Sequence, residues 1–349
     1  MSVLSTDKST LRCGVVGVGR MGRLHARVYA QSAAADLVGV VDVDPMRRAE
    51  VTEEWGGKPF ESVEELLEAG VDAVSIATPT VHHRAAAERL LAAGVACLIE
   101  KPLAPDLDQA RAIAEAAEQS EAVLQVGHIV RYDPVMVAIR KLGGLAAPRF
   151  IQIDRVSPMT FRSIDVGVVL DMMIHDLDLL LMLVGNEPDQ VQANAVCVIG
   201  GGEDVCNARL TFPADEDGVR CVANVTASRL ALKTERKIRI ITEEMYVSGD
   251  FVKRRGTVVR KAANAEQLAE VRRRLEKGES LADIDYLDLL QVEPLEVGTG
   301  EPLLRQIEDF LSAVRTGRHP TVDARAGFAA VRTAERISAA AREAGARTI

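Results

Sequence analysis

The first 126 residues alternate between short, continuously apolar runs and stretches with the spacing of amphipathic helices. Apolar strands that alternate with helices indicate a parallel sheet covered on both faces. Because crossovers between parallel strands are right-handed, the pattern predicts a doubly wound α/β sheet with its ligand crevice at the carboxyl ends of the strands. The predicted strands are Leu11–Val18, Leu37–Val43, Val71–Ala77, Val95–Ile99 and Ala122–Val126. The helices expected between them are Met21–Gln31, Pro45–Trp55, Ser62–Ala69, Val81–Ala93 and Leu107–Gln119.

After about Tyr132, strand-like segments follow one another with little helix between them, which predicts an α+β domain with a mostly antiparallel sheet. These segments are Arg149–Val156, Val191–Ile199, Asp204–Phe212, Val219–Ser228, Arg236–Glu243 and Met245–Phe251. The helices expected here are the strongly apolar Val168–Val184, the charged Ala262–Lys277, and the amphipathic Leu303–Arg315 and Arg325–Ala344. We predict two domains, residues 1–132 and 133–349, with the C-terminal helices packing back on the first.

Charge and composition argue against several classes of function. The 349 residues carry a formal net charge of −9 and no basic run, which argues against a nucleic-acid partner. The longest apolar runs are too short to span a bilayer, and the first ten residues lack the apolar region of a signal peptide. We therefore expect a cytoplasmic protein without a membrane partner. The five cysteines form no C-x-x-C pair, so neither a zinc site nor a disulfide framework is indicated.

Three glycines stand where the first predicted strand passes into the first helix. Gly17, Gly19 and Gly22 have the spacing G-x-G-x-x-G. In this context they allow a tight turn, the approach of a pyrophosphate, and close helix–strand packing, while the helix N-terminus attracts the phosphates. Asp42 ends the second strand, where a carboxylate binds the ribose hydroxyls of NAD and repels the 2′-phosphate of NADP. The pattern predicts a Rossmann domain that binds NAD through Gly17, Gly19, Arg20, Met21, Gly22 and Asp42.

NADP is the alternative cofactor, because the arginine pair Arg47 and Arg48 could hold its 2′-phosphate. They fall within the predicted helix Pro45–Trp55, where we expect them to be exposed.

Polar residues also follow the third and fourth predicted strands. The stretch Thr78–His83 follows the third strand, and Glu100-Lys101-Pro102 follows the fourth. Both stretches lie at the crevice side of the sheet, where a nicotinamide should lie. Lys101 is a candidate proton carrier there, and a Glu–Lys surface turn is the alternative. The residues predicted to contact the cofactor here are Thr78, Pro79, Thr80, His83, Glu100 and Lys101.

A second polar group falls in the apolar helix Val168–Val184. Asp171, His175 and Asp178 are spaced four and three residues apart, so they should project from one helix face. Asp171 can accept a hydrogen bond from one nitrogen of His175 and leave the other nitrogen for a substrate hydroxyl. A polar core cluster is the alternative. We expect no metal, because the sequence places no additional His or Cys ligand there.

Together these motifs resemble those of the glucose–fructose oxidoreductase, inositol dehydrogenase and MocA family (Gfo/Idh/MocA) over nearly the whole chain. The resemblance rests on Gly17–Gly22, Ala77–His83, Glu100–Pro102 and Asp171–Asp178. It implies that Lys101, Asp171 and His175 form the catalytic group and that a cis peptide precedes Pro102. It also implies that an open sheet in the second domain builds homodimers or homotetramers.

The same resemblance assigns His83 to the cofactor and leaves its neighbour His82 on the solvent side. Met173 stands where the family often has glycine, which suggests a bulkier helix contact beneath the catalytic group.

Two further stretches, Val126–Pro134 and Arg155–Asp176, look like those of the UDP-N-acetylglucosamine 3-dehydrogenase branch. That branch makes a 3-keto nucleotide sugar for amination by a partner aminotransferase. Its arginines would contact the diphosphate or ring hydroxyls, because guanidinium binds phosphate bidentately. The predicted substrate-binding residues are Lys101, Arg131, Arg155, Arg162, Asp171 and His175.

The resemblance predicts an NAD-dependent dehydrogenase that oxidises a sugar hydroxyl, with C3 of UDP-N-acetylglucosamine as the expected position. His175, with Lys101 alongside, would remove the hydroxyl proton while Asp171 holds His175 and Lys101 stabilises the alkoxide. Which of the two is the terminal base is left open. The alternatives are a myo-inositol or free-sugar dehydrogenase and, in another class, a non-catalytic NAD-binding regulator. The combination of Lys101, Asp171 and His175 argues against a regulator, which needs no proton-transfer group.

Overall fold

The computed structural model describes residues 10–145, 147–160, 166–199, 201–262, 265–281, 284 and 289–346. The chain divides into two compact units, which are described separately. The first unit is Met1–Tyr132, Val169–Met182 and Gly300–Ala339, and the second is Asp133–Val168, Leu183–Thr299 and Ala340–Ile349. None of the helices in the described residues combines the length and the hydropathy needed to cross a membrane.

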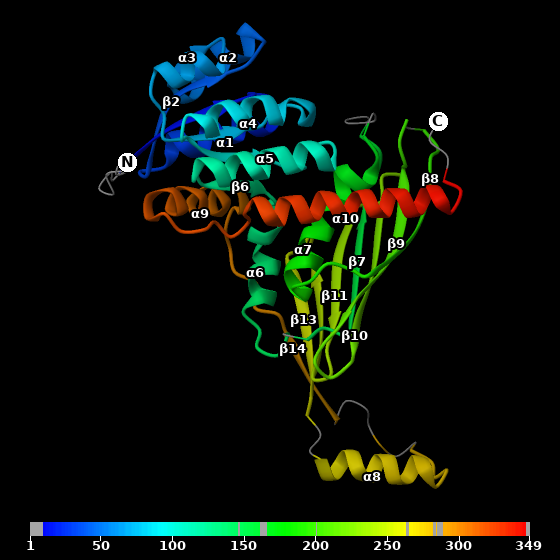
Figure 1. The fold of residues 1–349 in the computed structure, drawn as a ribbon. Coiled ribbons are helices and arrows are strands. Elements are labelled where there is room, and N and C mark those ends of the chain that lie inside the picture. Colours follow the sequence, from blue (N-terminus) through cyan, green and yellow to red (C-terminus); the bar gives the residue numbers. More distant parts are fainter. Residues whose placement is uncertain are drawn as a thin grey trace. The chain divides into compact units, whose positions relative to one another are not determined.

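The first unit is built on a six-stranded parallel sheet in the order β3-β2-β1-β4-β5-β6. Figure 1 labels β2 and β6 of this sheet among the helices α1 to α5. This is the doubly wound order, in which the direction of strand addition reverses between β1 and β4. The strands are β1 (Leu11–Val16), β2 (Ala35–Val41), β3 (Lys58–Phe60), β4 (Ala73–Ile76), β5 (Ala96–Glu100) and β6 (Leu124–Gly127). The prediction of a doubly wound parallel sheet is confirmed. The three-residue edge strand β3 is not among the strands predicted from the sequence.

Helices cover both faces of this sheet, and the strand residues alternate between two cores. Leu98 of β5 belongs to the core shared with α1 and α9, whereas Cys97 and Ile99 belong to the core shared with α3, α4, α5 and α10. The helices are α1 (Arg20–Gln31), α2 (Pro45–Trp55), α3 (Val63–Glu68), η1 (Thr80–His82), α4 (His83–Ala92), α5 (Leu107–Ser120), η2 (Ile129–Tyr132), η3 (Val169–Met173), α7 (Ile174–Val184), α9 (Pro302–Thr316) and α10 (Ala324–Glu343).

The second unit contains an eight-stranded sheet in the order β14-β13-β12-β11-β7-β10-β9-β8. Only the pair β7 and β10 is parallel among the pairs described, so the sheet is mostly antiparallel, as predicted. The strands are β7 (Phe150–Val156), β8 (Gln190–Val196), β9 (Val205–Ala214), β10 (Arg220–Ser228), β11 (Glu235–Ile241), β12 (Met245–Asp250), β13 (Arg255–Lys261) and β14 (Leu290–Pro294). Strands β13 and β14 are not among those predicted from the sequence.

Alternate residues of β9 and β10 are buried, which is the pattern of a sheet covered on one face. Helix α6 (Pro134–Arg140) packs on β12, where a Cβ at Gly249 would lie 2.8 Å from Val135 Cγ1. Helix α6 is not among the helices predicted from the sequence, although Asp133 as N-cap and Pro134 as first helical residue are a common start signal. Helix α8 (Ala265–Glu276) lies between β13 and β14 in the chain, and its described side chains are largely exposed.

Candidate active site

The glycine-rich turn lies where β1 ends, beside the end of β4. Gly17 has a φ of +83°, and a Cβ there would lie 2.6 Å from the backbone nitrogen of Thr78. A Cβ at Gly22 would overlap the carbonyl oxygen of Gly17, whereas a Cβ at Gly19 would meet nothing within 4 Å. Close packing therefore requires Gly17 and Gly22, and Gly19 leaves open space at the start of α1.

The start of α1 has the properties of an anion site. Gly19 is its N-cap and has no side chain that could cap the first amide groups of the helix. A hollow of about 410 Å³ adjoins this turn. The residues that line it include Val18, Gly19, Arg20, Arg23, Arg47 and Glu50. The uncapped amides, the open space at Gly19 and the nearby arginines fit the pyrophosphate of a dinucleotide.

Asp42 follows β2 and lies next to the same turn. Its Oδ2 accepts a hydrogen bond of 2.8 Å from the backbone N–H of Val18, and its Oδ1 accepts one of 2.9 Å from Asp44. The carboxylate thus braces the turn and still has lone pairs for ribose hydroxyls. The expectation that Arg48 is exposed is wrong: its side chain is buried and donates to the carbonyl oxygen of Asp42. Arg47 is exposed, as expected.

His83 links the loops that follow β4 and β5. Its Nε2 lies 3.0 Å from the carbonyl oxygen of Thr78, and its Nδ1 lies 3.1 Å from that of Pro102. The ring is buried, and burial lowers the pKa of His83. His83 therefore braces the two loops from within, while His82 is exposed, as expected. The peptide bond between Lys101 and Pro102 is cis, as the family resemblance implied.

Lys101 pairs with Asp171. Its Nζ donates to Asp171 Oδ1 at 3.1 Å and to the Asp171 carbonyl oxygen at 2.6 Å. A single α-helix is predicted over Val168–Val184, but the segment begins as a π-helix, η3, and becomes α-helical only at Ile174. The contact of Asp171 with Lys101, which follows β5, is a finding that the helical spacing alone does not predict. Met173 is buried within this π-helix.

His175 lies in the first turn of α7, and its ring lies near that of His128. The two ring centroids are 6.4 Å apart, and the ring planes are inclined by 83°. His128 directly follows β6 and is 1% exposed. Burial lowers the pKa of His128. Thus Lys101, Asp171, His175 and His128 form one group at the carboxyl ends of β5 and β6.

Arg131 forms a buried bidentate ion pair with Asp178. Its Nε and Nη2 donate to the two carboxylate oxygens at 2.7 and 2.6 Å, and its Nη1 donates to the carbonyl oxygen of Thr321 at 3.0 Å. All three guanidinium nitrogens therefore have partners within the protein. This arrangement favours a structural role for Arg131 over the predicted contact with substrate.

The two other predicted substrate arginines belong to the second unit. Arg155 lies in β7, is buried, and is near enough to Asp133 that its charge acts on that carboxyl group. Burial nevertheless raises the pKa of Asp133 overall. Arg162 lies outside the described residues.

A buried hydrogen-bonded chain beneath the site was not foreseen. His25 Nδ1 lies 2.8 Å from Ser75 Oγ, His25 Nε2 lies 3.0 Å from Glu100 Oε1, and Tyr29 Oη lies 2.7 Å from Ser75 Oγ. The chain connects α1 to β4 and to Glu100, the residue before Lys101. A serine in the middle of the apolar strand β4 is the sequence signal that could have indicated it.

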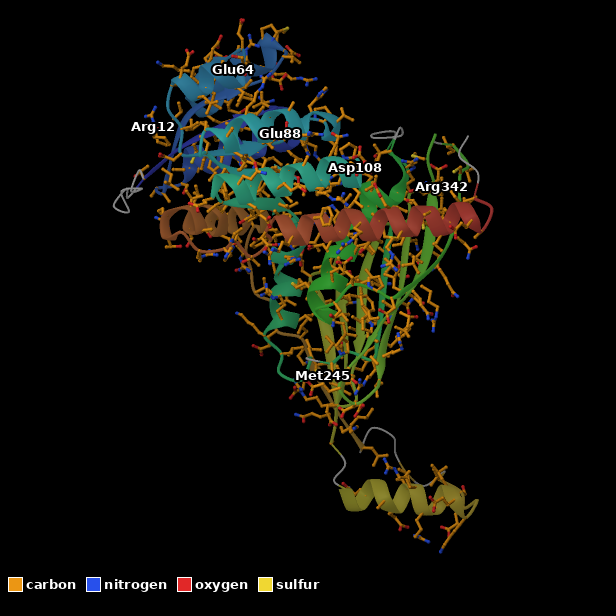
Figure 2. All side chains as sticks on the ribbon, viewed as in Figure 1. Arg12, Glu64, Glu88, Asp108, Met245 and Arg342 are labelled. Atoms are coloured by element: carbon orange, nitrogen blue, oxygen red, sulfur yellow. The ribbon has the colours of Figure 1, made fainter. Side chains whose placement is uncertain are left out.

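The opposite edge of the sheet has different features. Arg12, labelled in Figure 2, lies in β1 and its Nε donates to the carbonyl oxygen of Gly70 at 2.7 Å. A hollow of about 530 Å³ lies at the amino end of β6, with Glu121, Arg318 and Asp323 in its wall. Neither feature adjoins the glycine-rich turn or Lys101. No three His, Cys, Asp or Glu side chains in the described part of the chain are grouped to hold a metal ion.

Known proteins share this organisation. Residues 11–128 match the family described as "Oxidoreductase family, NAD-binding Rossmann fold", and residues 151–248 match the "GFO/IDH/MocA C-terminal domain". The chain is 37% identical over 317 residues to the UDP-N-acetylglucosamine 3-dehydrogenase of Acidithiobacillus ferrooxidans, covering 91% of this chain and 93% of that one. A solved structure of the A. ferrooxidans enzyme has a TM-score of 0.83 and 36% identity, covering 96% of this chain and 98% of that one.

The inositol 2-dehydrogenase of Rhizobium meliloti is 33% identical over 199 residues, which cover 54% of this chain and 60% of that one. These matches confirm the family resemblance seen in the motifs, and with it a dehydrogenase-type enzyme with NAD as its cofactor. The chain belongs to the Gfo/Idh/MocA family of NAD-binding oxidoreductases.

Proposed function

We propose that the protein oxidises the C3 hydroxyl of UDP-N-acetylglucosamine to the 3-keto nucleotide sugar. The observation that carries the chemistry is the pair of Lys101 with Asp171, 3.1 Å apart, next to His175 at the carboxyl ends of the parallel strands. The observation that favours this substrate is the 37% identity, over 91% of this chain, to an enzyme named for it.

The residues that would hold NAD lie along the ends of β1, β2 and β4. Gly17, Gly19 and Gly22, together with the start of α1, would receive the pyrophosphate, and Asp42 would bind the adenosine ribose. Thr78 fits the same surface, because its Oγ1 is buried without a hydrogen-bond partner among the described residues. We extend the assignment to Arg20, Met21, Pro79, Thr80 and Glu100, and place His83 behind these loops as their brace. Bound NAD would supply the hydride acceptor.

The remaining chemistry is proton transfer by the chain itself. Lys101, held by the carboxylate and carbonyl oxygens of Asp171, would donate a hydrogen bond to the substrate oxygen and stabilise it as its proton leaves. His175 would take that proton as general base. Asp171 would position Lys101 and prevent it from turning away. Lys101 remains the alternative base.

We propose that residues 1–132 bind the cofactor and that residues 133–349 bind substrate, as expected from the sequence. Arg155 and Arg162 are the candidate diphosphate contacts there. We further propose a cytoplasmic homodimer or homotetramer whose ketone product passes to an aminotransferase. A myo-inositol dehydrogenase is the second candidate, supported by the 33% identity to an inositol 2-dehydrogenase over 54% of this chain.

Calorimetry with UDP-N-acetylglucosamine, N-acetylglucosamine and myo-inositol, each in the presence of NADH, tests the substrate. We expect the nucleotide sugar to bind more tightly than the free sugar by several kcal/mol, on the order of one or two bidentate phosphate contacts, and to bind more weakly at high salt. Formation of NADH should be slight alone and should increase when an aminotransferase and glutamate remove the ketone. Tighter binding of myo-inositol would overturn the proposal in favour of the second candidate.

A further inference from the structure

His128 occupies a position next to the catalytic group that the proposed mechanism does not use. Strands β5 and β6 pair in register, with Glu100 opposite Gly127. Lys101 and His128 are therefore the residues that directly follow the two strands. A Cβ at Gly127 would lie 2.9 Å from Glu100 Oε1, so strands β5 and β6 approach closely at this point.

The His128 side chain is buried, yet its polar atoms have no partner in the described structure. It is 1% exposed, and neither Nδ1 nor Nε2 has a hydrogen-bond partner among the described residues. Burying a polar group without a hydrogen bond is unfavourable, and an apolar ring would avoid that penalty. A buried imidazole at this position therefore indicates that its nitrogens have a function.

The neighbouring ring of His175 indicates what that function is. The ring centroids are 6.4 Å apart in an edge-to-face arrangement, and neither His128 nitrogen makes a direct hydrogen bond to the His175 ring among the described residues. Two hydrogen bonds of about 2.8 Å each, through one bridging oxygen, span a distance of this order. We propose that His128 is a positioning residue for the proton transfer, and that through one bridging oxygen its imidazole stabilises the proton taken up by His175. The proposal rests on the proposed function, which assigns that proton to His175.

The surrounding charges are compatible with this role. Burial lowers the pKa of His128, and the charges of Asp178 and Arg131 act on it in opposite directions. Lys101 also lowers this pKa, while Glu100 raises it. His128 is therefore neutral near pH 7 and keeps one lone pair that can accept a hydrogen bond. A neutral ring also adds no positive charge beside His175 when His175 becomes protonated.

Three variants separate the nitrogens from the ring. His128→Phe keeps an aromatic ring without nitrogens, His128→Asn keeps polar atoms without the ring, and His82→Asn is the control at an exposed histidine. We expect His128→Phe to lower kcat by about tenfold to a hundredfold, the factor for one lost hydrogen bond to a charged group. The acid limb of its kcat profile should move to lower pH, because protonated His175 loses its partner. His128→Asn should recover part of both changes, and His82→Asn should match the wild type.

A second measurement is independent of turnover. In the NADH-bound protein with 15N-labelled histidine, the His175 resonance is assigned from its loss in His175→Asn. Its titration midpoint should shift to lower pH in His128→Phe, and the wild-type His128 ring should show a hydrogen-bonded imine nitrogen. A folded His128→Phe variant with wild-type kcat and an unchanged His175 titration would overturn the proposal. If that variant does not fold, an imine nitrogen of wild-type His128 without a hydrogen bond would overturn it instead. If the wild type does not oxidise UDP-N-acetylglucosamine, the proposed function fails while the titration still decides the role of His128.

Discussion

Replacing Asp42 by Asn separates the two tasks of this carboxylate. In the described structure its two oxygens accept hydrogen bonds from the backbone N–H groups of Val18 and Asp44, at 2.8 and 2.9 Å. An alanine would leave both backbone donors without this partner and disturb the glycine-rich turn. Asparagine keeps the shape and one acceptor oxygen, so it removes the negative charge and one of the two backbone hydrogen bonds. It is therefore the cleaner test of cofactor selection.

The expected loss of NAD affinity in Asp42→Asn follows from the change of the hydrogen-bond acceptor from a charged to a neutral group. Hydrogen bonds to charged groups contribute about 1.5–3 kcal/mol and neutral ones about 0.5–1.5 kcal/mol, so each ribose hydroxyl loses about 1 kcal/mol. Two ribose hydroxyls then lose about 2 kcal/mol, which raises the Kd for NAD by roughly 30-fold. NADP should bind better than it does to the wild type, because its 2′-phosphate no longer meets a carboxylate.

Isothermal titration calorimetry with NAD and NADP measures both affinities. Asp44→Asn is the matched control: Asp44 is the N-cap of α2, and asparagine is an equally good cap, so the Kd for NAD should not change. Circular dichroism verifies that each variant is folded. An unchanged Kd for NAD in a folded Asp42→Asn protein would refute the reasoning and leave Asp42 only as a brace for the turn.

Three further outcomes follow from the site. Lys101→Met and His175→Asn should each lower turnover by about a hundredfold or more. The Kd for NAD should change little in His175→Asn, and near-normal turnover of that variant across pH would assign the proton to Lys101. Asp178→Asn should lower the free energy of unfolding in urea by about 3–5 kcal/mol, because it leaves Arg131 charged and buried. Arg131→Met combined with Asp178→Leu should recover much of that loss, and no recovery would contradict the role of the buried charge. Because burial lowers the pKa of His83 from 6.5, the unfolded chain binds more protons as the pH falls below that value. The free energy of unfolding should therefore be highest above pH 6.5. It should decrease as the pH falls from 6.5 toward the folded-state pKa of His83, by up to about 1.4 kcal/mol per pH unit. Urea unfolding at several pH values, with His83→Gln as the comparison, checks this slope.

The sequence was most informative where a signal is local and strong. The strands of the parallel sheet are buried on both faces, so each is a continuous apolar run that periodicity can detect. The three strands that were missed are short or lie near a sheet edge. β3 has three residues, and β14, at the edge of its sheet, is largely exposed. β13 has only a short apolar centre between charged residues. Register and edge position come from pairing with distant strands, which a single sequence does not display.

The site was predicted as a set of residues, but its internal contacts were not. The motifs brought Lys101, Asp171 and His175 together, and the structure pairs Lys101 with Asp171 at 3.1 Å. The sequence pattern predicted an α-helix through Asp171, whereas Asp171 lies in the π-helix η3. Arg131 and Asp178 are 47 residues apart, and their pairing depends on how η2 and α7 pack. No local pattern encodes such a contact.

Two ion pairs near His175 differ in burial, and this difference indicates which pair takes part in the reaction and which has a structural role. The side chains of Lys101 and Asp171 are 20% and 33% exposed, whereas those of Arg131 and Asp178 are 8% and 1% exposed. A group that transfers a proton must change charge during the reaction, which is least costly where ligand and solvent can respond. The Arg131–Asp178 pair sums to zero charge and is fixed by two parallel hydrogen bonds, so it holds η2 against α7 without changing charge. Lys101 can respond to a substrate oxygen, and Arg131 cannot do so without breaking its pair. The burial of the two pairs therefore favours Lys101 for the chemistry and Arg131 for the support of His175 and His128.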